Sequence, residues 1–108
     1  MIRMLPLDLD RSMFCLYDDA RLLAKCYYDP ESGEILSLEM MDPEIAMSLR
    51  SGLIKAVLSR LEYAGILTAW SENAELFPLL KTLRFTLVSE GRMSVSLKGY
   101  FDHACECK

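Results

Sequence analysis

The chain has a single histidine and no cluster of basic residues, although 12 of its 108 residues are lysine or arginine. These basic residues are scattered along the sequence, and the formal net charge is -4. A protein that grips the phosphate backbone of a nucleic acid usually gathers positive charge on one face. We therefore expect no nucleic-acid partner. With only one histidine, a Ser-His-Asp or Cys-His nucleophile arrangement is not expected either.

Long apolar runs are also missing. No run approaches the roughly 20 residues that a membrane-spanning helix needs. Pro6 and Asp8 interrupt the first residues, where the core of a secretory signal would be unbroken and apolar. We expect no membrane partner and a cytoplasmic protein. Only 4 prolines and 5 glycines occur, whereas 52% of the residues are hydrophobic, so we expect residues 1–108 to form one folded domain.

The four cysteines fall into two groups. Cys15 and Cys26 each lie in an apolar, strand-like run, which favours reduced core thiols over a disulfide framework. Cys105 and Cys107 lie near His103, and thiolate with imidazole is a ligand set for zinc or copper. The spacing is not that of a zinc finger or knuckle, and a fourth ligand would have to come from elsewhere. We interpret this group as an irregular tail and expect no metal site.

Alternating apolar and polar residues predict a meander of strands in the N-terminal part. Ser12–Tyr17 and Leu22–Tyr28 flank a short polar connection that suits a hairpin loop. The turn sequence DPESG then leads into a third strand, Ile35–Met40. Residues 1–9 hold a shorter apolar run. It predicts an edge strand, because Pro6 cannot donate a backbone hydrogen bond to a neighbouring strand.

The next segment predicts one long amphipathic helix. Asp42 is a favourable N-cap, and Pro43 suits the first helical position, because that position has no use for the amide hydrogen that proline lacks. Gly65 is expected to end the helix as its C-cap glycine. An apolar stripe repeats every three or four residues and predicts the face that packs on the sheet: Ala46, Leu49, Leu53, Ile54, Val57, Leu58, Leu61 and Ala64.

A further strand and a second helix follow the long helix. The short apolar run Ile66–Trp70 predicts a buried strand parallel to Ile35–Met40. Asn73 or Ser71 can cap a short helix after it. Pro78 is expected to make the first turn of that helix irregular, because an interior proline loses one hydrogen bond and crowds the preceding turn.

The last predicted feature is a hairpin of Phe85–Val88 and Arg92–Leu97 around Glu90 and Gly91. The sequence therefore predicts an α/β (α+β) fold with a mixed sheet: an antiparallel meander, a strand-helix-strand-helix core and a C-terminal hairpin. In such units, ligands gather outside the carboxyl ends of the strands, where helix N-termini offer free amide donors.

This order of elements resembles the core of the GCN5-related N-acetyltransferases, the GNAT superfamily of acyl-CoA N-acyltransferases. In that family, the strand after the long helix is followed by Asn, a small or apolar residue, an aliphatic-aromatic pair and Gly-Phe. Counting back from Gly65, the long helix also has the family's length. The resemblance covers about residues 13–97. The predicted second helix of this chain matches the family spacing at Asn73, Leu76, Leu79, Leu80, Leu83 and Phe85.

The resemblance implies that the chain binds an acyl-CoA, such as acetyl-CoA, and transfers the acyl group to an amine. The acyl-CoA would lie between splayed strands, with its pyrophosphate on the first amides of the long helix. The arm of the cofactor would be held by the asparagine that opens the second helix. The residues assigned to the cofactor in this way are Met41, Ser48, Leu49, Arg50, Ser51 and Asn73.

Glu39 is the candidate catalytic base. It lies near the end of the third strand, close to where relatives carry a carboxylate that deprotonates the attacking amine. A second interpretation stays open, because Leu36, Leu38 and Met40 can form the inward set of this strand. Glu39 would then be an outward polar residue on an alternating strand.

The chain departs from the family pattern at positions that serve cofactor binding and proton transfer in the family. The glycine loop Arg/Gln-x-x-Gly-x-Gly/Ala is absent, since residues 45–52 read IAMSLRSG. Leu80 stands where a tyrosine often protonates the leaving thiolate, and Arg84 replaces the glycine before Phe85. Most of the N-terminal helical region that lines the acceptor groove is also lacking. The alternative function is therefore a catalytically inactive binding or assembly module, most simply a homodimer paired through its N-terminal or last strand.

Overall fold

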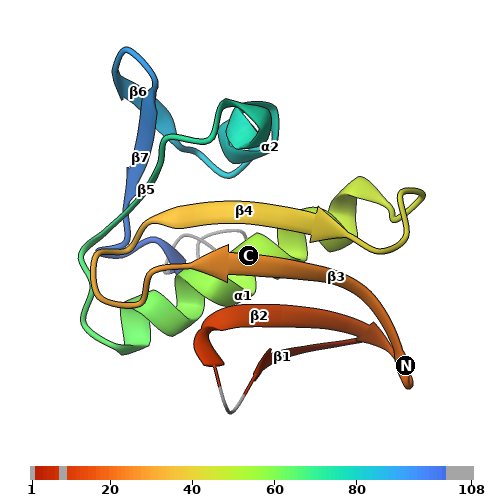
Figure 1. Ribbon diagram of the computed structural model, residues 1–108. Helices are drawn as coiled ribbons and strands as arrows, with labels where there is room; N and C mark the ends of the chain where they lie inside the picture. Colours follow the sequence, from red (N-terminus) through yellow and green to blue (C-terminus); the bar gives the residue numbers. More distant parts are fainter. Residues whose placement is uncertain (1, 8–9, 102–108) are drawn as a thin grey trace, which may run out of the picture.

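The computed structural model describes residues 2–7 and 10–101. It contains a four-stranded sheet of order β1-β2-β3-β4 and a three-stranded sheet of order β5-β7-β6 (Figure 1). This architecture confirms the predicted α/β (α+β) fold with its N-terminal meander and C-terminal hairpin. The elements are β1 (Ile2–Leu7), β2 (Asp10–Asp18), β3 (Arg21–Tyr28), β4 (Ile35–Met40), α1 (Met47–Tyr63), β5 (Thr68–Ser71), the 3-10 helix η1 (Ala74–Leu76), α2 (Phe77–Thr82), β6 (Thr86–Ser89) and β7 (Arg92–Ser96).

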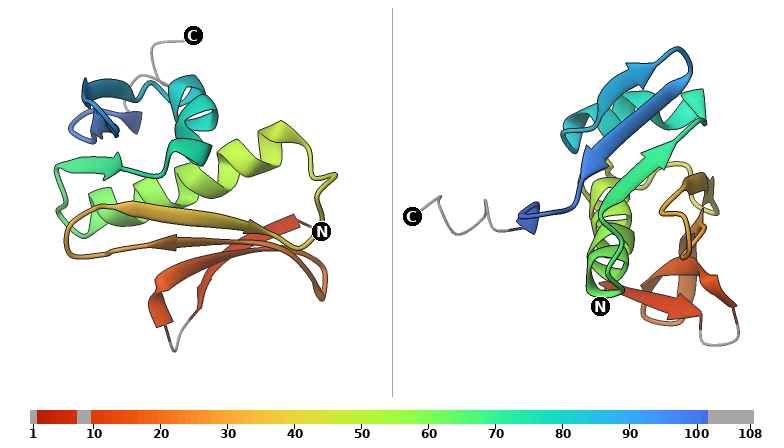
Figure 2. Two further views of the ribbon diagram at one scale, coloured as in Figure 1. Left: turned by 45° about the horizontal axis from the view of Figure 1, so that its top comes forward. Right: turned by 90° about the vertical axis from the view of Figure 1, so that its left-hand side faces the viewer.

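The first sheet is an antiparallel meander with β1 at its outer edge, as predicted. Pro6 lies in β1 opposite Phe14, and the register shifts between Pro6 and Leu7. The β2–β3 hairpin turns at Asp19, whose φ is 53°. Helix α1 runs across one face of this sheet (Figure 2).

The contact between α1 and the sheet is made by the middle of the predicted stripe. Its two end residues, Ala46 and Ala64, are exposed, and Leu49 is only partly buried. Burying each large aliphatic side chain contributes about 1.5–3 kcal/mol to folding, so this central contact dominates the attachment of the helix. The fully buried residues of α1 are Leu53, Ile54, Val57, Leu58 and Leu61.

The predicted start of the long helix is wrong, because α1 begins at Met47 and not at Pro43. The Asp42 carboxylate accepts a hydrogen bond from the backbone amide two residues later at 3.0 Å, and its carbonyl accepts one from the amide of Ile45. Asp42 therefore closes a local turn instead of capping a helix. Ala46 is then extended, with φ -59° and ψ 145°, and its side chain makes no cap hydrogen bond.

The predicted end of the helix at Gly65 is confirmed. Gly65 has a φ of 90°, and the amides of Gly65 and Ile66 donate to carbonyls of the last turn at 3.0 and 2.9 Å. This pair of bonds is a Schellman motif. Because the motif uses Ile66, strand β5 begins at Thr68, and Leu67 is 70% exposed. The predicted bounds of this strand, and the burial of Leu67, were wrong, whereas Ile66 is partly buried and packs against the core.

The two sheets meet where β5 runs parallel to the start of β4, as predicted. The contact includes one parallel bridge, between Glu34 and Trp70. The backbone amide of Trp70 donates to the carbonyl of Gly33 at 3.1 Å, and its indole N–H donates to the carbonyl of Ser32 at 3.1 Å. The Trp70 side chain thus fastens the β3–β4 turn to the second sheet.

Two side chains extend this junction with further hydrogen bonds to β4. The hydroxyl of Ser71 donates to the carbonyl of Ile35 at 2.7 Å, and the side-chain amide of Asn73 donates to the carbonyl of Leu36 at 3.0 Å. Beyond Leu36 the chain after β5 turns into η1, while β4 continues in its own sheet (Figure 1). The divergence opens a space between β4 and α2.

The second helical segment begins irregularly, as predicted. The side-chain oxygen of Asn73 accepts the amide of Glu75 at 3.1 Å, which caps η1. Pro78 stands in the first turn of α2, where its missing amide hydrogen is not needed. No helix among residues 2–7 and 10–101 is both long enough and apolar enough to cross a membrane.

The chain after β7 returns to the end of α2. The hydroxyl of Tyr100 donates to the carbonyl of Leu83 at 2.9 Å, and the guanidinium of Arg84 donates to the carbonyl of Tyr100 at 3.0 Å. The Arg84 guanidinium also lies 4.4 Å from the centre of the Tyr100 ring. Arg84 has a φ of 69°, a conformation that favours glycine, and the ring and carbonyl contacts help to hold it there.

Candidate functional site

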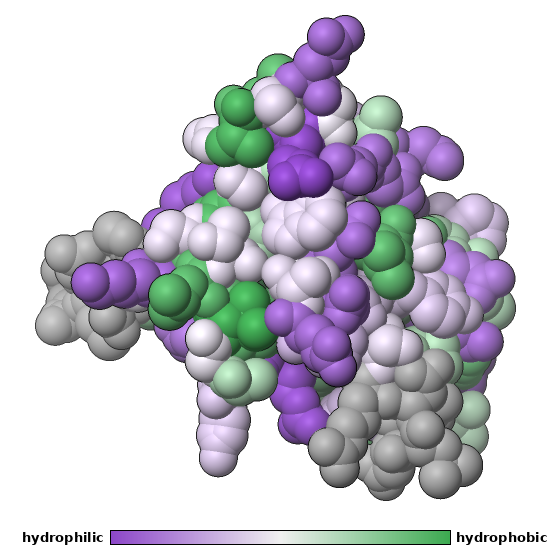
Figure 3. Space-filling view, turned by 60° about the vertical axis from the view of Figure 1, so that its left-hand side comes forward, coloured by the Kyte–Doolittle hydropathy of each residue, from purple (hydrophilic) through white to green (hydrophobic). Residues whose placement is uncertain are grey.

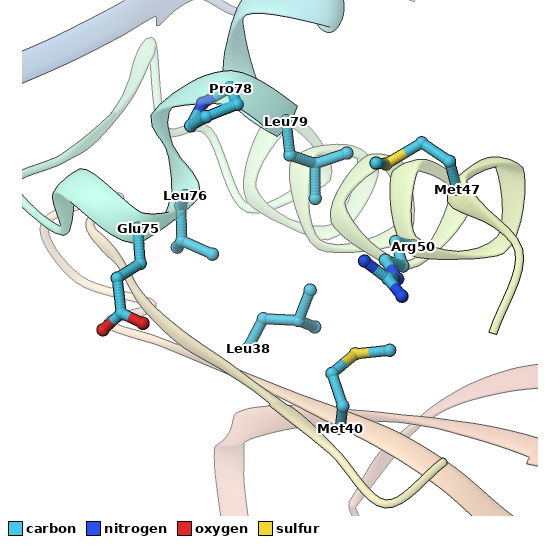
Figure 4. A pocket seen from close by; sticks show the side chains of 8 residues that line it. All are labelled: Leu38, Met40, Met47, Arg50, Glu75, Leu76, Pro78 and Leu79. Atoms are coloured by element: carbon cyan, nitrogen blue, oxygen red, sulfur yellow. The ribbon is translucent and has the colours of Figure 1, made fainter. Parts of the chain in front are cut away.

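A cavity of about 390 Å³ lies where β4 and α2 diverge. Its walls come from the end of β4, the first turn of α1, and η1 with α2 (Figure 4). Arg50 and Met47 stand at one end and Glu75 at the other, with apolar side chains between them. The size is that of a small-molecule site. The lining residues are Leu38, Met40, Met47, Arg50, Glu75, Leu76, Pro78 and Leu79.

Arg50 supplies the positive charge of this lining. One terminal nitrogen of its guanidinium donates to the carbonyl of Pro43 at 3.0 Å, which holds the side chain against the loop before α1. Its Nε is buried and has no hydrogen-bond partner among the described residues. A buried donor without a partner costs about 1–3 kcal/mol. The positive charge of the guanidinium lies at this end of the cavity, where it attracts an anion.

The first turn of α1 adds to the positive potential at this end. The N-cap residue is Ala46, whose methyl group cannot accept a hydrogen bond, and the first turn contains no acidic residue. The first amides of a helix carry a partial positive charge. In α1 the amide of Leu49 already donates to the carbonyl of Ala46 at 3.0 Å, so the donors that remain for a ligand are the amides of Met47 and Ser48. Together with the Arg50 guanidinium, they make this end of the cavity favourable for a phosphate or carboxylate group.

The alternation of side chains along β4 separates Glu39 from the cavity. Leu38 and Met40 both line it, so Glu39 between them lies on the opposite face of the strand. Glu39 is exposed, and its carboxylate accepts a hydrogen bond from the hydroxyl of Tyr27 at 3.3 Å. Its role as a catalytic base stays a prediction. The carboxylate in the cavity wall is that of Glu75.

The proposed inward set of β4 was partly wrong. The register between β3 and β4 shifts between Tyr27 and Tyr28, next to Leu36. As a result Ile35 is fully buried, whereas Leu36 is 43% exposed. Leu38 keeps its inward orientation and reaches the cavity.

The residues that the family resemblance assigned to a cofactor are not all brought together. Arg50 lines the cavity, and the other five do not. Asn73 already donates to the Leu36 carbonyl and accepts from the Glu75 amide, so its side chain holds the junction that opens the cavity. The residues outside the lining are Met41, Ser48, Leu49, Ser51 and Asn73.

The sequence patterns did not identify most of the cavity wall that η1 and α2 form. Leu76 and Leu79 are three residues apart, and both were identified only as part of a family spacing. That separation places them on one side of a helical segment, and both are nearly buried, which identifies them as wall residues once the cavity is known. Glu75 gave no sequence signal, because an exposed acidic residue in a helix usually only faces water.

The two described cysteines are free and buried, which confirms the prediction of reduced core thiols. Burial raises the pKa of Cys26 to about 12 and also raises the pKa of Cys15, so both thiols stay protonated at neutral pH. Among the described residues, no group of His, Cys, Asp and Glu could hold a metal ion. The group of His103, Cys105 and Cys107 lies outside the described residues.

Comparisons with known proteins identify the fold. No protein-family model matches the sequence, and no curated protein matches it. The structure is similar to the ribosomal-protein-S18-alanine N-acetyltransferase from Escherichia coli, with a TM-score of 0.63 and 16% identity over 79% of this chain and 68% of that chain. Ard1 from Thermoplasma volcanium gives a TM-score of 0.64 and 15% identity over 80% of this chain and 70% of the other. The chain has the GNAT fold.

A third GNAT-fold structure bears on the cofactor. It is that of yncA from Salmonella typhimurium, solved with its cofactor acetyl-CoA. Its TM-score is 0.61 and its identity is 13%, over 79% of this chain and 64% of that chain. At such identities the likeness concerns the fold alone, so the function of this GNAT-fold chain has to be argued from its own cavity.

Proposed function

We propose that the cavity binds the pantetheine and pyrophosphate part of an acyl-CoA, and that the chain slowly transfers the acyl group to an amine. The observation that carries the proposal is the Arg50 guanidinium in the cavity wall, whose Nε has no hydrogen-bond partner among the described residues. The uncapped first turn of α1 stands beside it. These donors suit a pyrophosphate, and the apolar middle of the cavity suits an extended pantetheine chain.

The two ends of the cavity differ in charge, and this difference gives the ligand a direction. With the pyrophosphate at Arg50, the thioester would point toward Glu75 at the opposite end (Figure 4). An exposed carboxylate there attracts a protonated amine and accepts its proton. The neutral amine nitrogen then attacks the thioester carbonyl and a C–N bond forms. The nitrogen releases its second proton to water, and the C–S bond breaks.

The departing thiolate would take its proton from water. Leu80 occupies the position at which relatives often carry a tyrosine, and it is fully buried in the core. A leucine cannot donate a proton, and a buried leucine cannot position a water molecule. We therefore expect slow turnover, since a positioned general acid contributes about 10²–10⁴-fold to a rate.

Calorimetric titration with acetyl-CoA and with CoA tests the binding step. Both should bind, because they share the pyrophosphate and the pantetheine. Arg50→Gln should weaken binding roughly 10- to 100-fold, since it removes a charge-assisted contact worth about 1.5–3 kcal/mol. Lys55→Gln is the matched control, because Lys55 is an exposed cation on α1 outside the lining and its loss should change little. Equal loss in both variants would contradict the assignment.

Release of free CoA in the presence of amines tests the transfer step. With polyamine and peptide acceptors, Glu75→Gln should lower the rate at least tenfold if Glu75 accepts the proton. Glu39→Gln should leave the rate unchanged, because Glu39 lies across β4 from the cavity. The reverse result would restore Glu39 as the base.

The second candidate function is a catalytically inactive binding module. It is favoured by the buried Leu80 and by the outward Glu39, which together remove the two proton-transfer groups of the family. Tight binding of acetyl-CoA with no release of CoA above the uncatalysed rate would select it. In that outcome the cavity would still be the ligand site.

A further inference from the structure

Strand β6 is an open edge of the second sheet. The order β5-β7-β6 leaves one side of β6 without a neighbouring strand among the described residues. All four of its residues are exposed, Leu87 to 62% and Val88 to 57%. Figure 3 shows apolar atoms exposed near the end of the molecule where the β6–β7 hairpin lies. An edge of this kind offers backbone donors and acceptors to another strand.

Strands β1 and β6 are each an edge of their sheet, and these two edges are protected to different degrees. β1 carries Arg3 and Pro6, and charge and proline both discourage further strand pairing. β6 reads Thr-Leu-Val-Ser and has neither. Its register shifts between Leu87 and Ser89, but Thr86 and Leu87 keep regular partners in β7. Of these two edges, the one at β6 is therefore more open to pairing.

An apolar groove of about 300 Å³ adjoins this edge. Leu87 forms one side of it and α2 forms the other. Pro78 lines both this groove and the cavity near Arg50. The groove is lined by Phe77, Pro78, Lys81, Leu87 and Met93.

We propose that β6 pairs in antiparallel fashion with β6 of a second copy of this chain, around a twofold axis near Leu87 and Val88. Self-pairing sets each residue of β6 opposite another uncharged residue, so it carries no like-charge repulsion. The exposed apolar side chains of each copy then cover the groove of the other. This inference does not depend on acyl-CoA binding.

Charge complementarity favours a second copy over an unrelated peptide. Glu90 follows β6 directly, whereas Lys81 belongs to the helix just before β6 and lines the groove. In an antiparallel pair, the end of one strand lies beside the start of its partner. The Glu90 of one copy would therefore approach the Lys81 of the other, and symmetry makes this contact twice.

Sedimentation equilibrium in a reducing buffer, from about 2 to 200 µM protein, tests the proposal; a four-residue edge makes a small interface with weak affinity. The wild-type mass should rise from monomer to dimer over this range. Leu87→Lys should raise the dimer dissociation constant at least tenfold, because it places a like charge on both sides of the axis. Leu67→Lys is the control, since Leu67 is 70% exposed but lies before β5. It should dimerise like the wild type.

Amide hydrogen exchange on the wild-type chain gives a second readout that needs no variant. Exchange of the amides of Thr86–Ser89 should slow as the protein concentration rises, while exchange in β1 should not change. A wild-type chain that stays monomeric at about 200 µM would overturn the proposal and leave β6 as an edge for a different partner. A dimer with unprotected β6 amides, or equal disruption by Leu67→Lys, would also overturn it.

Discussion

Gly33→Ala should be strongly destabilising, because Gly33 holds the turn at which the two sheets meet. Gly33 has a φ of 85°, which an L side chain rarely adopts. A methyl group on its α carbon would lie 2.4 Å from the carbonyl oxygen of Thr68 and 2.9 Å from a methyl carbon of Ile66. The first of these neighbours is backbone, so β5 itself would have to move.

The size of the effect follows from three contributions. Left-handed backbone geometry costs alanine about 1–2 kcal/mol. Displacing β5 also strains or breaks the hydrogen bond from the Trp70 amide to the Gly33 carbonyl, worth about 1 kcal/mol. With the contact itself, we expect a total loss of about 3–4 kcal/mol, a large part of the stability of a domain of this size.

Gly91→Ala is the matched control. Gly91 has a φ of 80°, and an added methyl group there would meet no atom within 4 Å. It should therefore lose only the backbone contribution of about 1–2 kcal/mol. Urea unfolding followed by circular dichroism measures both variants. If Gly33→Ala is no less stable than Gly91→Ala, the close approach of β5 to Gly33 is refuted.

Three further predictions concern stability. Gly52→Ala should stabilise α1 by up to about 1 kcal/mol in urea unfolding, because alanine favours a helix more than glycine does. The added methyl group would closely approach only the flexible end of the Met4 side chain, and a loss of stability would contradict the prediction. Tyr100→Phe should cost about 1–2 kcal/mol, because the buried carbonyl of Leu83 loses its donor; no change would refute that role. Burial raises the pKa of Cys26 to about 12. The contribution of this thiol to the free energy of unfolding is therefore complete below about pH 9, and it is lost as the pH rises from there toward 12. Alkaline unfolding should therefore be less steep in Cys26→Ala, and equal slopes would exclude Cys26 as a cause.

The fold could be predicted from the sequence because its signals are local. Gly65 predicted the end of α1, the apolar stripe predicted the buried face of α1, and Pro78 predicted an irregular turn. The start of α1 could not be predicted in the same way. Asp42 looks like a cap whether it closes a helix or a short turn, and only the extended backbone of Ala46 distinguishes the two.

The candidate site was harder to predict, because it depends on where two strands part. The divergence is set by hydrogen bonds from Ser71 and Asn73 to carbonyls of β4, and these partners are 36 and 37 residues apart. No local pattern reports such contacts. Arg50 was identified through the family resemblance, whereas Glu75 became visible only when the cavity walls were known.

The most direct test of the cavity as an acyl-CoA site follows the backbone amide signals of ¹⁵N-labelled protein during titration with acetyl-CoA. The largest shifts should occur at the first turn of α1, at the end of β4 and in η1 with α2. Signals of β1 and of the β2–β3 turn should stay in place. Large shifts confined to other parts of the chain, or no shift at millimolar acetyl-CoA, would contradict the assignment of the cavity as an acyl-CoA site.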